Sequence, residues 1–446
     1  MRKSLLAMAA LMGISTLPAH AWRVNIDKET YADIGFSTQI WGRNEGKRTD
    51  ASTDHNATNF SVNLVNITSS GHVNKLVYFF INAESTAFRG NFITRDAFIG
   101  MKFAEEFRVQ AGAMRVPFSR IALTSAYNFI IPTQAYGGTV SVRLAPNVNM
   151  QMPDNVFRGL NINPTDALGV LGDGSRDAGI VAWGNVADGM LKYYLGVSDG
   201  RFDRRGGFFT DTTVTPNVNY TKDSLAYTIR LQFTPTMLGF KPETGYTLAD
   251  TYLGKQNVLT LGVGYRAVKA QTTGLSNLGL HDYSKTAKMW TVDMLYEQKF
   301  GDLVPNLQVG YINAKDVPFF ANKLGGVFVV GYGKATQIYA QGQLLYDQVV
   351  GFGKPALAIR WEQDKNKDLS TFNTTTGASS VGTAQPKNTR VGVFVHYYIK
   401  GQAAKVSIGV DSVSRNTDSK NNDPNNIVGA NGKSFTDFTL HLQTQF

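Results

Sequence analysis

The chain has 446 residues, a formal net charge of +10 and no cysteine. The absence of cysteine excludes a disulfide framework and a lipid-anchored N-terminus. A basic balance of this size suits nucleic acid, acidic lipid or an anionic solute as partner. Because the sequence carries no arginine-rich arm and no nucleic-acid-binding motif, we expect no nucleic acid partner.

The N-terminal residues have the pattern of a secretory signal peptide. Arg2 and Lys3 precede an apolar run at 5–17, and Ala19-His20-Ala21 supplies a small-x-small cleavage site. We expect residues 1–21 to be removed, which leaves a mature chain of 22–446. The run is too short to span a bilayer as a helix, and no later segment offers about 18 uninterrupted apolar residues. A helical membrane protein is therefore excluded.

Segments that alternate apolar and polar residues fill most of the mature chain and predict β-strands. The first runs from Tyr31 to Gly42, with Ile34, Phe36 and Ile40 on one phase. The others lie at 59–70, 73–84, 93–104, 106–115, 177–186, 189–200, 223–234, 256–269, 286–299, 305–314, 324–333, 355–364, 388–400, 402–414 and 434–446. Their number, about 16, and their length predict an all-β fold, a transmembrane antiparallel β-barrel.

The connections between these strands alternate in length, as periplasmic turns and extracellular loops of such barrels do. Short connections lie at 69–71, 104–106, 185–189, 301–305 and 400–401, and long polar ones at 43–58, 201–222, 271–285, 365–387 and 415–433. Both chain ends should lie in the periplasm, so the strand number should be even.

Segment 335–349 is open to two interpretations. It could be a further strand, but Ile338, Tyr339, Leu345 and Tyr346 also fit one face of a helix. We assign it to a periplasmic connection outside the wall. The alternative is an 18-strand barrel, in which this segment and another, within 236–255, join the wall.

The last strand supports an outer-membrane location in a Gram-negative-type envelope. Phe438, Leu440, Leu442 and Phe446 share one phase, and polar residues such as His441 occupy the other. A final strand that ends on an aromatic residue is what the barrel-assembly machinery usually receives. The alternative is the edge strand of a soluble sandwich.

Residues 116–176 form a long insertion between two predicted strands. A structureless loop of this length is uncommon unless it folds inward and has a function, so we expect a constriction loop in the barrel. It contains several arginines and no lysine. We assign the pore constriction to Arg115, Arg120, Arg143 and Arg158.

Strand phase predicts which charges face the lumen. A lipid-facing Arg or Lys near the midplane costs roughly 2–4 kcal/mol, so Arg230, between outward Ile229 and Leu231, should point inward. The same rule gives the pore lining Lys102, Arg108, Lys192, Arg230, Arg266, Arg360, Arg390 and Lys405, and fewer inward acids, Asp33, Asp293, Glu297, Glu362 and Asp411. A positively biased passage favours anions. The alternative is that the arginines pair with wall carboxylates and merely hold the loop.

The sequence gives no signal for catalysis, a metal or a cofactor. The mature chain's histidines (His55, His72, His281, His396 and His441) lack metal-ligand or triad spacing. Residues 364–368 resemble the start of a calcium loop but lack its glycine and distal glutamate. We therefore predict a protein that is not an enzyme.

Several motifs occur in a characteristic order. RDAFIG at 95–100 leads to GAMRVPFSR at 112–120, and RDAGIVAWG at 176–184, YYLGVSDG at 193–200 and RLQFTP at 230–235 follow. This order resembles the phosphate-selective porins of O and P type. The resemblance implies a sixteen-strand, trimeric channel with anion selectivity in some members. Because the insertion lacks the lysines expected for tight phosphate selectivity, we carry over only the scaffold and a general anion bias.

The resulting hypothesis is an outer-membrane porin, a passive diffusion channel for small hydrophilic solutes that prefers anions. Its expected partners are outer-membrane lipid, small anionic or polar solutes and two further copies in a homotrimer. One alternative is a barrel that sheathes a partner protein such as a cytochrome. The other is an outer-membrane hydrolase.

Overall fold

The computed structural model describes residues 22–47, 56–86, 92–132, 176–199, 219–220, 225–273, 281–282, 284–324, 327–373, 375–381, 385, 387–417 and 433–446. The predicted signal peptide, residues 1–21, lies outside these ranges. So do residues 133–175 of the insertion, which include Arg143 and Arg158. Across the described ranges, no helix is long and apolar enough to cross a membrane.

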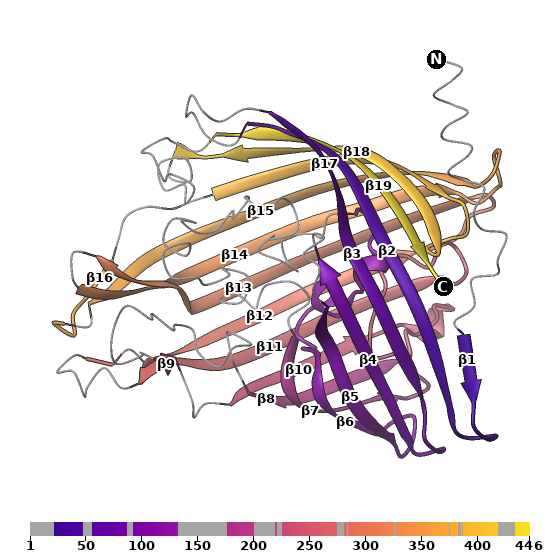
Figure 1. Ribbon diagram of the computed structural model, residues 1–446, viewed down its shortest axis with the longest axis horizontal. Coiled ribbons are helices and arrows are strands. Elements are labelled where there is room, and N and C mark those ends of the chain that lie inside the picture. The colour runs from indigo at the N-terminus through magenta and orange to yellow at the C-terminus, as the bar shows by residue number, and fades with distance from the viewer. Residues whose placement is uncertain are drawn as a thin grey trace.

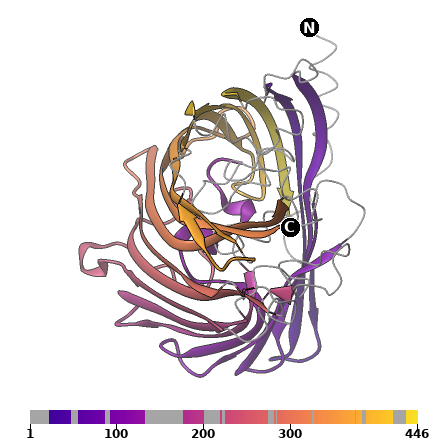
Figure 2. The same cartoon turned by 90° about the vertical axis from the view of Figure 1, so that its left-hand side faces the viewer.

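Sixteen antiparallel strands close into a barrel (Figures 1 and 2). They are β2 (Tyr31–Glu45), β3 (Ala57–His72), β4 (Val77–Thr86), β5 (Ile93–Lys102), β6 (Arg108–Arg115), β7 (Arg176–Val186), β8 (Leu191–Ser198), β10 (Ala226–Phe233), β11 (Val258–Thr273), β12 (Ser284–Glu297), β13 (Leu303–Leu324), β14 (Val327–Tyr346), β15 (Lys354–Asn373), β17 (Lys387–Tyr398), β18 (Ala404–Arg415) and β19 (Phe435–Gln445). β19 pairs with β2 from Phe438↔Asn44 to Gln445↔Ser37, which closes the sheet. The predicted fold class and even strand number are confirmed.

Three short strands extend the sheet without adding to the closed wall. β9 (Asn219–Tyr220) pairs with β11, and β16 (Ser379–Val381) pairs with β15. β1 (Trp22–Asn25) pairs with the start of β2. Phe446 exchanges backbone hydrogen bonds of 2.9 and 3.0 Å with Phe36. The two ends of the described chain thus lie along the same edge of β2.

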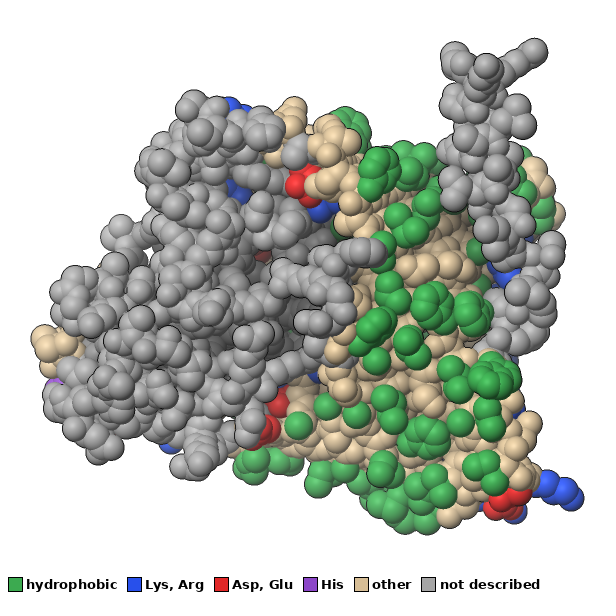
Figure 3. Space-filling model, viewed as in Figure 1, with side chains coloured by type: hydrophobic (Ala, Val, Ile, Leu, Met, Phe, Trp, Pro, Cys, Tyr) green, Lys and Arg blue, Asp and Glu red, His purple; other side chains and the backbone are tan. Residues whose placement is uncertain are grey.

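Exposure alternates along the wall as the sequence pattern predicts. On β10, Tyr227, Ile229 and Leu231 are exposed, whereas Arg230 and its inward neighbours are buried. Figure 3 shows hydrophobic side chains distributed over the described outer wall. This apolar outer surface suits lipid, because charged groups there would be costly.

The assignment of 335–349 to an off-wall connection is wrong. Residues up to Tyr346 belong to β14, which pairs with β13 and β15 (Ala340↔Val309 and Ala340↔Trp361). Tyr339 and Leu345 are buried inward, whereas Ile338 is exposed. This alternation is that of a strand. The inward Tyr339 and Leu345 suggested a helix because they are apolar, and they contact residues inside the barrel. The predicted strand 324–333 is the other part of β14, so the total remains sixteen.

Strand length differs strongly around the barrel. β13, β14 and β15 have 22, 20 and 20 residues, whereas β6, β8 and β10 have eight each. The long strands extend well beyond the short ones at one end of the molecule (Figure 1). One turn also moves, because β3 continues through the predicted turn 69–71 to His72, and the chain reverses at 73–76.

Candidate functional site

Two segments of the chain enter the barrel and pack against part of its inner wall. The first lumen segment, residues 116–132, follows β6 and contains α2 (Arg120–Leu123) and η1 (Ala126–Asn128). The second lumen segment, residues 234–257, joins β10 to β11; η2 (Thr236–Leu238) near its start is exposed, and Glu243 and Asp250 further on are buried. They meet at a parallel bridge between Thr124 and Leu248. The 18-strand alternative required a segment within 236–255 to join the wall, and these residues do not form a wall strand.

Local sequence explains how the first lumen segment turns inward. The Ser119 hydroxyl accepts a hydrogen bond of 3.2 Å from the Ala122 N–H and so caps α2. Arg120 N–H donates to Asp293 Oδ2 on β12 at 3.0 Å. A Cβ at Gly264 would lie only 2.0 Å from the Phe118 carbonyl oxygen, so glycine on β11 lets the segment approach the wall.

A buried ion pair between Arg120 and Glu243 joins the two lumen segments. Both side chains are almost fully buried. The Arg120 guanidinium also donates to Thr260 Oγ1 at 2.7 Å and to the Ala249 carbonyl at 2.8 Å. Burial acts to raise the pKa of Glu243, but the Arg120 guanidinium and the Tyr252 hydroxyl outweigh it, and this pKa lies below its usual value. The pair is therefore charged and fixes the segments to each other.

Asp250 anchors the second lumen segment to the wall. Its carboxylate accepts hydrogen bonds from Ile130 N–H at 3.2 Å, Gln308 Nε2 at 3.1 Å and Gln341 Nε2 at 3.2 Å. Burial raises the pKa of Asp250 to about 6, although these donors and the Arg120 charge oppose the rise. Glu297 of β12 accepts from Thr251 Oγ1 at 2.6 Å and from Gly254 N–H at 2.9 Å. Side chains of β12–β14 thus hold this segment.

Most of the predicted pore-lining cations lie inside the barrel with partners. Four arginines form ion pairs: Arg230 with Asp293, Arg266 with Asp177, Arg360 with Asp411 and Arg390 with Glu362. The two inward lysines hold the lumen segments: Lys192 contacts the Glu243 and Gly245 carbonyls, and Lys405 donates to the Phe129 carbonyl at 2.8 Å.

The remaining predicted residues lie nearer the ends of strands. Arg108 pairs with Glu105 and lies 4.4 Å from the Trp183 ring centroid. Lys102 also pairs with Glu105, at a turn where its side chain is 40% exposed. Arg115 donates to the Ala122 carbonyl at 3.0 Å. Of the four residues assigned to the constriction, the structure brings Arg115 and Arg120 to the first lumen segment, and whether they contact solute stays a prediction.

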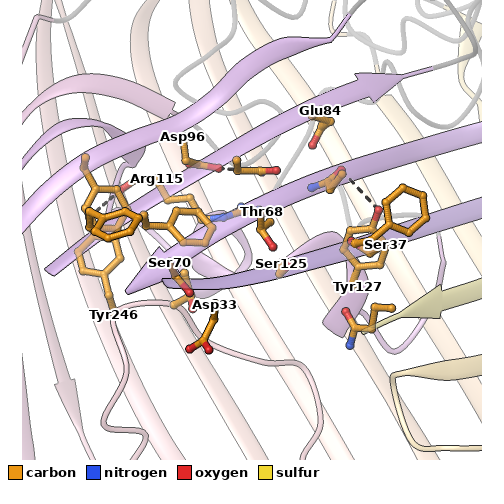
Figure 4. A pocket seen from close by; sticks show the side chains of 18 of the residues that line it. Asp33, Ser37, Thr68, Ser70, Glu84, Asp96, Arg115, Ser125, Tyr127 and Tyr246 are labelled. Carbon is orange, nitrogen blue, oxygen red and sulfur yellow. Dashed lines mark hydrogen bonds between the residues drawn. The ribbon is translucent and has the colours of Figure 1, made fainter. Parts of the chain in front are cut away.

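An open cavity of about 620 Å³ lies on the other side of the barrel. β2–β5 line it on one side, and residues of both lumen segments, such as Tyr127 and Tyr246, line it on the other. Figure 4 shows Asp33 and Ser70 toward one side of the cavity and Glu84 and Asp96 toward the other. Asp33 was predicted to face the lumen and Tyr127 belongs to the predicted constriction loop, whereas Ser70, Glu84 and Asp96 were not among the predicted lumen residues. The inward phase of β3 and β4 was the available signal.

The charged side chains that line the cavity are three carboxylates and two guanidinium groups, Asp33, Glu84, Asp96, Arg115 and Arg176. The three carboxylates each contact an arginine: Asp33 with Arg23 at 2.6 Å, Glu84 with Arg95 at 3.1 Å and Asp96 with Arg176 at 2.8 Å. The acids of the lining are therefore compensated by neighbouring arginines.

A closed sixteen-strand barrel with an apolar exterior and inward-folded segments is the architecture of an outer-membrane porin. The family model for phosphate-selective porin O and P matches residues 35–178. The match includes the motifs at 95–100 and 112–120, so the predicted resemblance is confirmed over this part of the chain. It also agrees with the predicted outer-membrane location. No curated protein sequence matches the chain.

Solved structures share the fold at low sequence identity. OprB of Pseudomonas putida has a TM-score of 0.55 and 8% identity, covering 94% of this chain and 95% of its own. OmpF of Salmonella typhi, in complex with daunomycin, has a TM-score of 0.50 and 15% identity, covering 95% and 100%. The outer membrane channel DcaP of Acinetobacter baumannii has a TM-score of 0.50 and 9% identity, covering 94% and 99%. These similarities concern the fold alone.

Proposed function

We propose that this chain is an outer-membrane porin that conducts small hydrophilic solutes by passive diffusion. The observation that carries the proposal is the cavity of about 620 Å³, enclosed by a barrel with an apolar outer wall and polar, ion-paired inner faces. The wall meets lipid, while the inner faces accommodate water and solutes. No reaction step is part of this function.

The proposal includes a weak preference for anions, which is supported by the family resemblance and by the guanidinium groups of Arg115 and Arg176 in the cavity lining. A positive charge in a passage of low dielectric raises the local anion concentration, and the lining carboxylates are each paired with an arginine. Phosphate is one anion that this charge would favour, without the dense basic cluster that tight phosphate selectivity requires.

The structure favours the channel over both alternatives. The two lumen segments occupy space that a sheathed partner protein would need. In the described cavity, His72 lies 5.4 Å from the Tyr31 ring and 6.0 Å from the Tyr78 ring, which is the setting of a wall residue. A homotrimer remains part of the proposal through the family resemblance, and native mass measurement in detergent would test it.

Planar bilayer recording tests the channel and its selectivity together. The mature chain, 22–446, should give stable conductance steps, and the zero-current potential in a tenfold KCl gradient should have the sign of modest chloride preference. Absence of steps would reject the channel. A potential of the cation-selective sign would reject the anion preference while leaving the channel in place.

A further inference from the structure

Seven lysines form a row on the outer wall, across the neighbouring strands β11–β15 and β17. On each of these strands the outward phase is largely apolar and then reaches a lysine, toward the end of the barrel that β13–β15 extend (Figure 1). This lysine belt consists of Lys269, Lys288, Lys315, Lys334, Lys365, Lys367 and Lys387. All seven are exposed or partly exposed, and the side chains of Lys315 and Lys334 are 60% and 48% exposed. The belt therefore lies on the outer surface of the barrel and not in its lumen.

Strand register sets like charges against each other in the lysine belt. Three pairs lie directly opposite each other: Lys288 and Lys315, Lys334 and Lys367, and Lys365 and Lys387. Side chains in such positions have Cβ atoms about 5 Å apart, and like charges there destabilise the sheet. Asp316 lies 4.0 Å from Lys315, and Asp368 lies 2.5 Å from Lys334, which offsets part of the repulsion. A bound anion that contacts several lysines would offset more of it.

Aromatic side chains on the outer wall give the height of the lysine belt. The Trp290 and Tyr311 ring centroids lie 5.0 Å apart, and Tyr265 lies opposite Trp290. Outward rings of this kind mark the boundary between hydrocarbon and water. Lys288 lies two positions beyond Trp290, and Lys315 four positions beyond Tyr311. Because two strand residues advance about 7 Å, the lysines lie roughly 7–13 Å past the rings along the strands, at the level of lipid headgroups.

The outer wall of the neighbouring strands β18, β19, β2 and β3 differs at the same end of the barrel. Outward positions there hold Ser412, Thr436, Asn44 and Thr58, which are uncharged. Thr436 Oγ1 lies 3.3 Å from Ser412 Oγ, and Asn44 Nδ2 donates to Thr58 Oγ1 at 2.7 Å. Lysines that served only the solubility of the loop end would have no reason to keep to one side of the barrel. Their placement indicates a particular partner beside β11–β17.

We propose that the lysine belt binds the phosphates of outer-leaflet lipid whose acyl chains lie on the apolar wall next to it. A phosphorylated glycolipid matches both parts of this surface, because its acyl chains would cover residues such as Val292, which is 43% exposed, while its phosphates contact the lysines. A free phosphate matches only the lysines, and an uncharged lipid only the apolar wall. This inference goes beyond the channel function and concerns the outer wall alone.

Binding to the wild-type protein tests the class of lipid first. Native mass spectrometry of the mature chain in an uncharged detergent counts bound molecules of phosphorylated lipid A, of lipid A without its phosphates, and of phosphatidylcholine. Phosphorylated lipid A should bind at the lowest concentration, and inorganic phosphate at an equal concentration should leave it bound. Equal binding of the two forms of lipid A would overturn the role of phosphate. Displacement by inorganic phosphate would overturn the lipid and indicate a site for free anions.

Variants then locate the site. Lys288→Gln with Lys315→Gln removes one opposed pair, and should raise the half-saturating concentration of lipid A roughly five- to thirtyfold, because each lysine near an anionic lipid surface contributes a factor of about five. Lys288→Arg with Lys315→Arg keeps both charges and should bind lipid A as the wild type does. Lys75→Gln with Lys299→Gln is the matched control. These two lysines are exposed in connections at the opposite end of the barrel, and the change should leave lipid A binding as it is.

Stability without lipid separates binding from folding. Removal of an opposed pair relieves repulsion, so the unfolding midpoint of lipid-free Lys288→Gln with Lys315→Gln should be no lower than that of the wild type, while the rise caused by lipid A should shrink. Equal lipid A affinity in this variant and in the control would overturn the site, and so would loss of binding in the arginine variant. If the glutamine variant does not fold, Lys365→Gln with Lys367→Gln takes its place. A protein that binds lipid A in this way but never conducts fails as a porin and keeps the lysine belt as a lipid site.

Discussion

The two sides of the barrel interior differ in what the inward charges do. On the filled side, where the lumen segments meet β10–β12, Arg120 and Arg230 are fully buried, each in an ion pair. Arg360 and Arg390 are equally buried and form ion pairs along β15–β18. On the open side, along β2–β5, the paired charges border a cavity and share it with aromatic rings. An inward arginine is therefore no guide to the ion path by itself. Its surroundings decide whether it holds the lumen segments in place or contacts solute.

The largest expected effect is on the stability of the filled side. Glu243→Ala leaves the Arg120 guanidinium buried without its carboxylate, and breaking a buried pair in this way costs about 3–5 kcal/mol. We expect a lower thermal unfolding midpoint and noisier conductance, measured in detergent and in bilayers. Glu29→Gln is the control, because its pair with Lys75 is exposed and worth about 0–1 kcal/mol. Equal effects of the two substitutions would contradict the fastening role of Glu243.

Charge reversal on the open side should change selectivity. Arg115→Glu replaces a positive charge of the cavity lining by a negative one and leaves four lining carboxylates beside Arg176. The zero-current potential in a KCl gradient should then change sign, from chloride to potassium preference. An unchanged potential would show that Arg115 lies off the ion path.

The pH dependence of the filled side should follow Asp250. Its folded pKa of about 6 lies above the unfolded value, so the folded state holds the proton more readily between roughly pH 4 and 6. Stability from this group is present below that window and is lost as the pH rises through the window to about 6. The unfolding midpoint should fall between about pH 4 and 6, and less so in Asp250→Asn. The same fall in both proteins would exclude Asp250 as its cause.

The smallest expected effect is on the selectivity of a variant at a buried arginine of the inner wall. Arg390 is fully buried and paired with Glu362, away from the cavity lining. Arg390→Gln should therefore leave the zero-current potential close to that of the wild type, even where it lowers the unfolding midpoint. A shift as large as that of Arg115→Glu would restore Arg390 to the pore lining that strand phase predicts.

Strand phase predicts the wall well, because lipid on one side and water or polar groups on the other impose alternation on every strand. It places Arg230 and Arg360 on the inner face correctly. It cannot predict what covers that face, since the second lumen segment has no period of its own to reveal its position. Tyr339 and Leu345 illustrate the difficulty: they face inward and apolar, which imitates a helical face until the segments that they contact are known.

The row of aromatic rings on the inner faces of β2–β5, formed by Tyr31, His72, Tyr78, Phe98 and Phe80, was equally hard to predict. Its members come from four strands, and only the register that sets Tyr31 opposite His72 and Phe80 opposite Phe98 brings them together. The motifs near Arg115 and Arg120, by contrast, predicted that the chain leaves the wall there. They could not predict that Arg120 forms an ion pair with Glu243, which lies 123 positions further along the chain.

Cysteine accessibility in single channels tests most directly whether solutes pass along the open side. The chain has no cysteine of its own, so Thr68→Cys in the cavity and Ser407→Cys on the filled side each create one thiol. A charged methanethiosulfonate reagent reacts with an accessible thiolate. It should reduce the current through Thr68→Cys channels and leave Ser407→Cys channels unchanged, because Thr68 lines the cavity and Ser407 is fully buried. Block of Ser407→Cys channels with no block of Thr68→Cys channels would place the passage on the filled side and contradict a solute path along β2–β5.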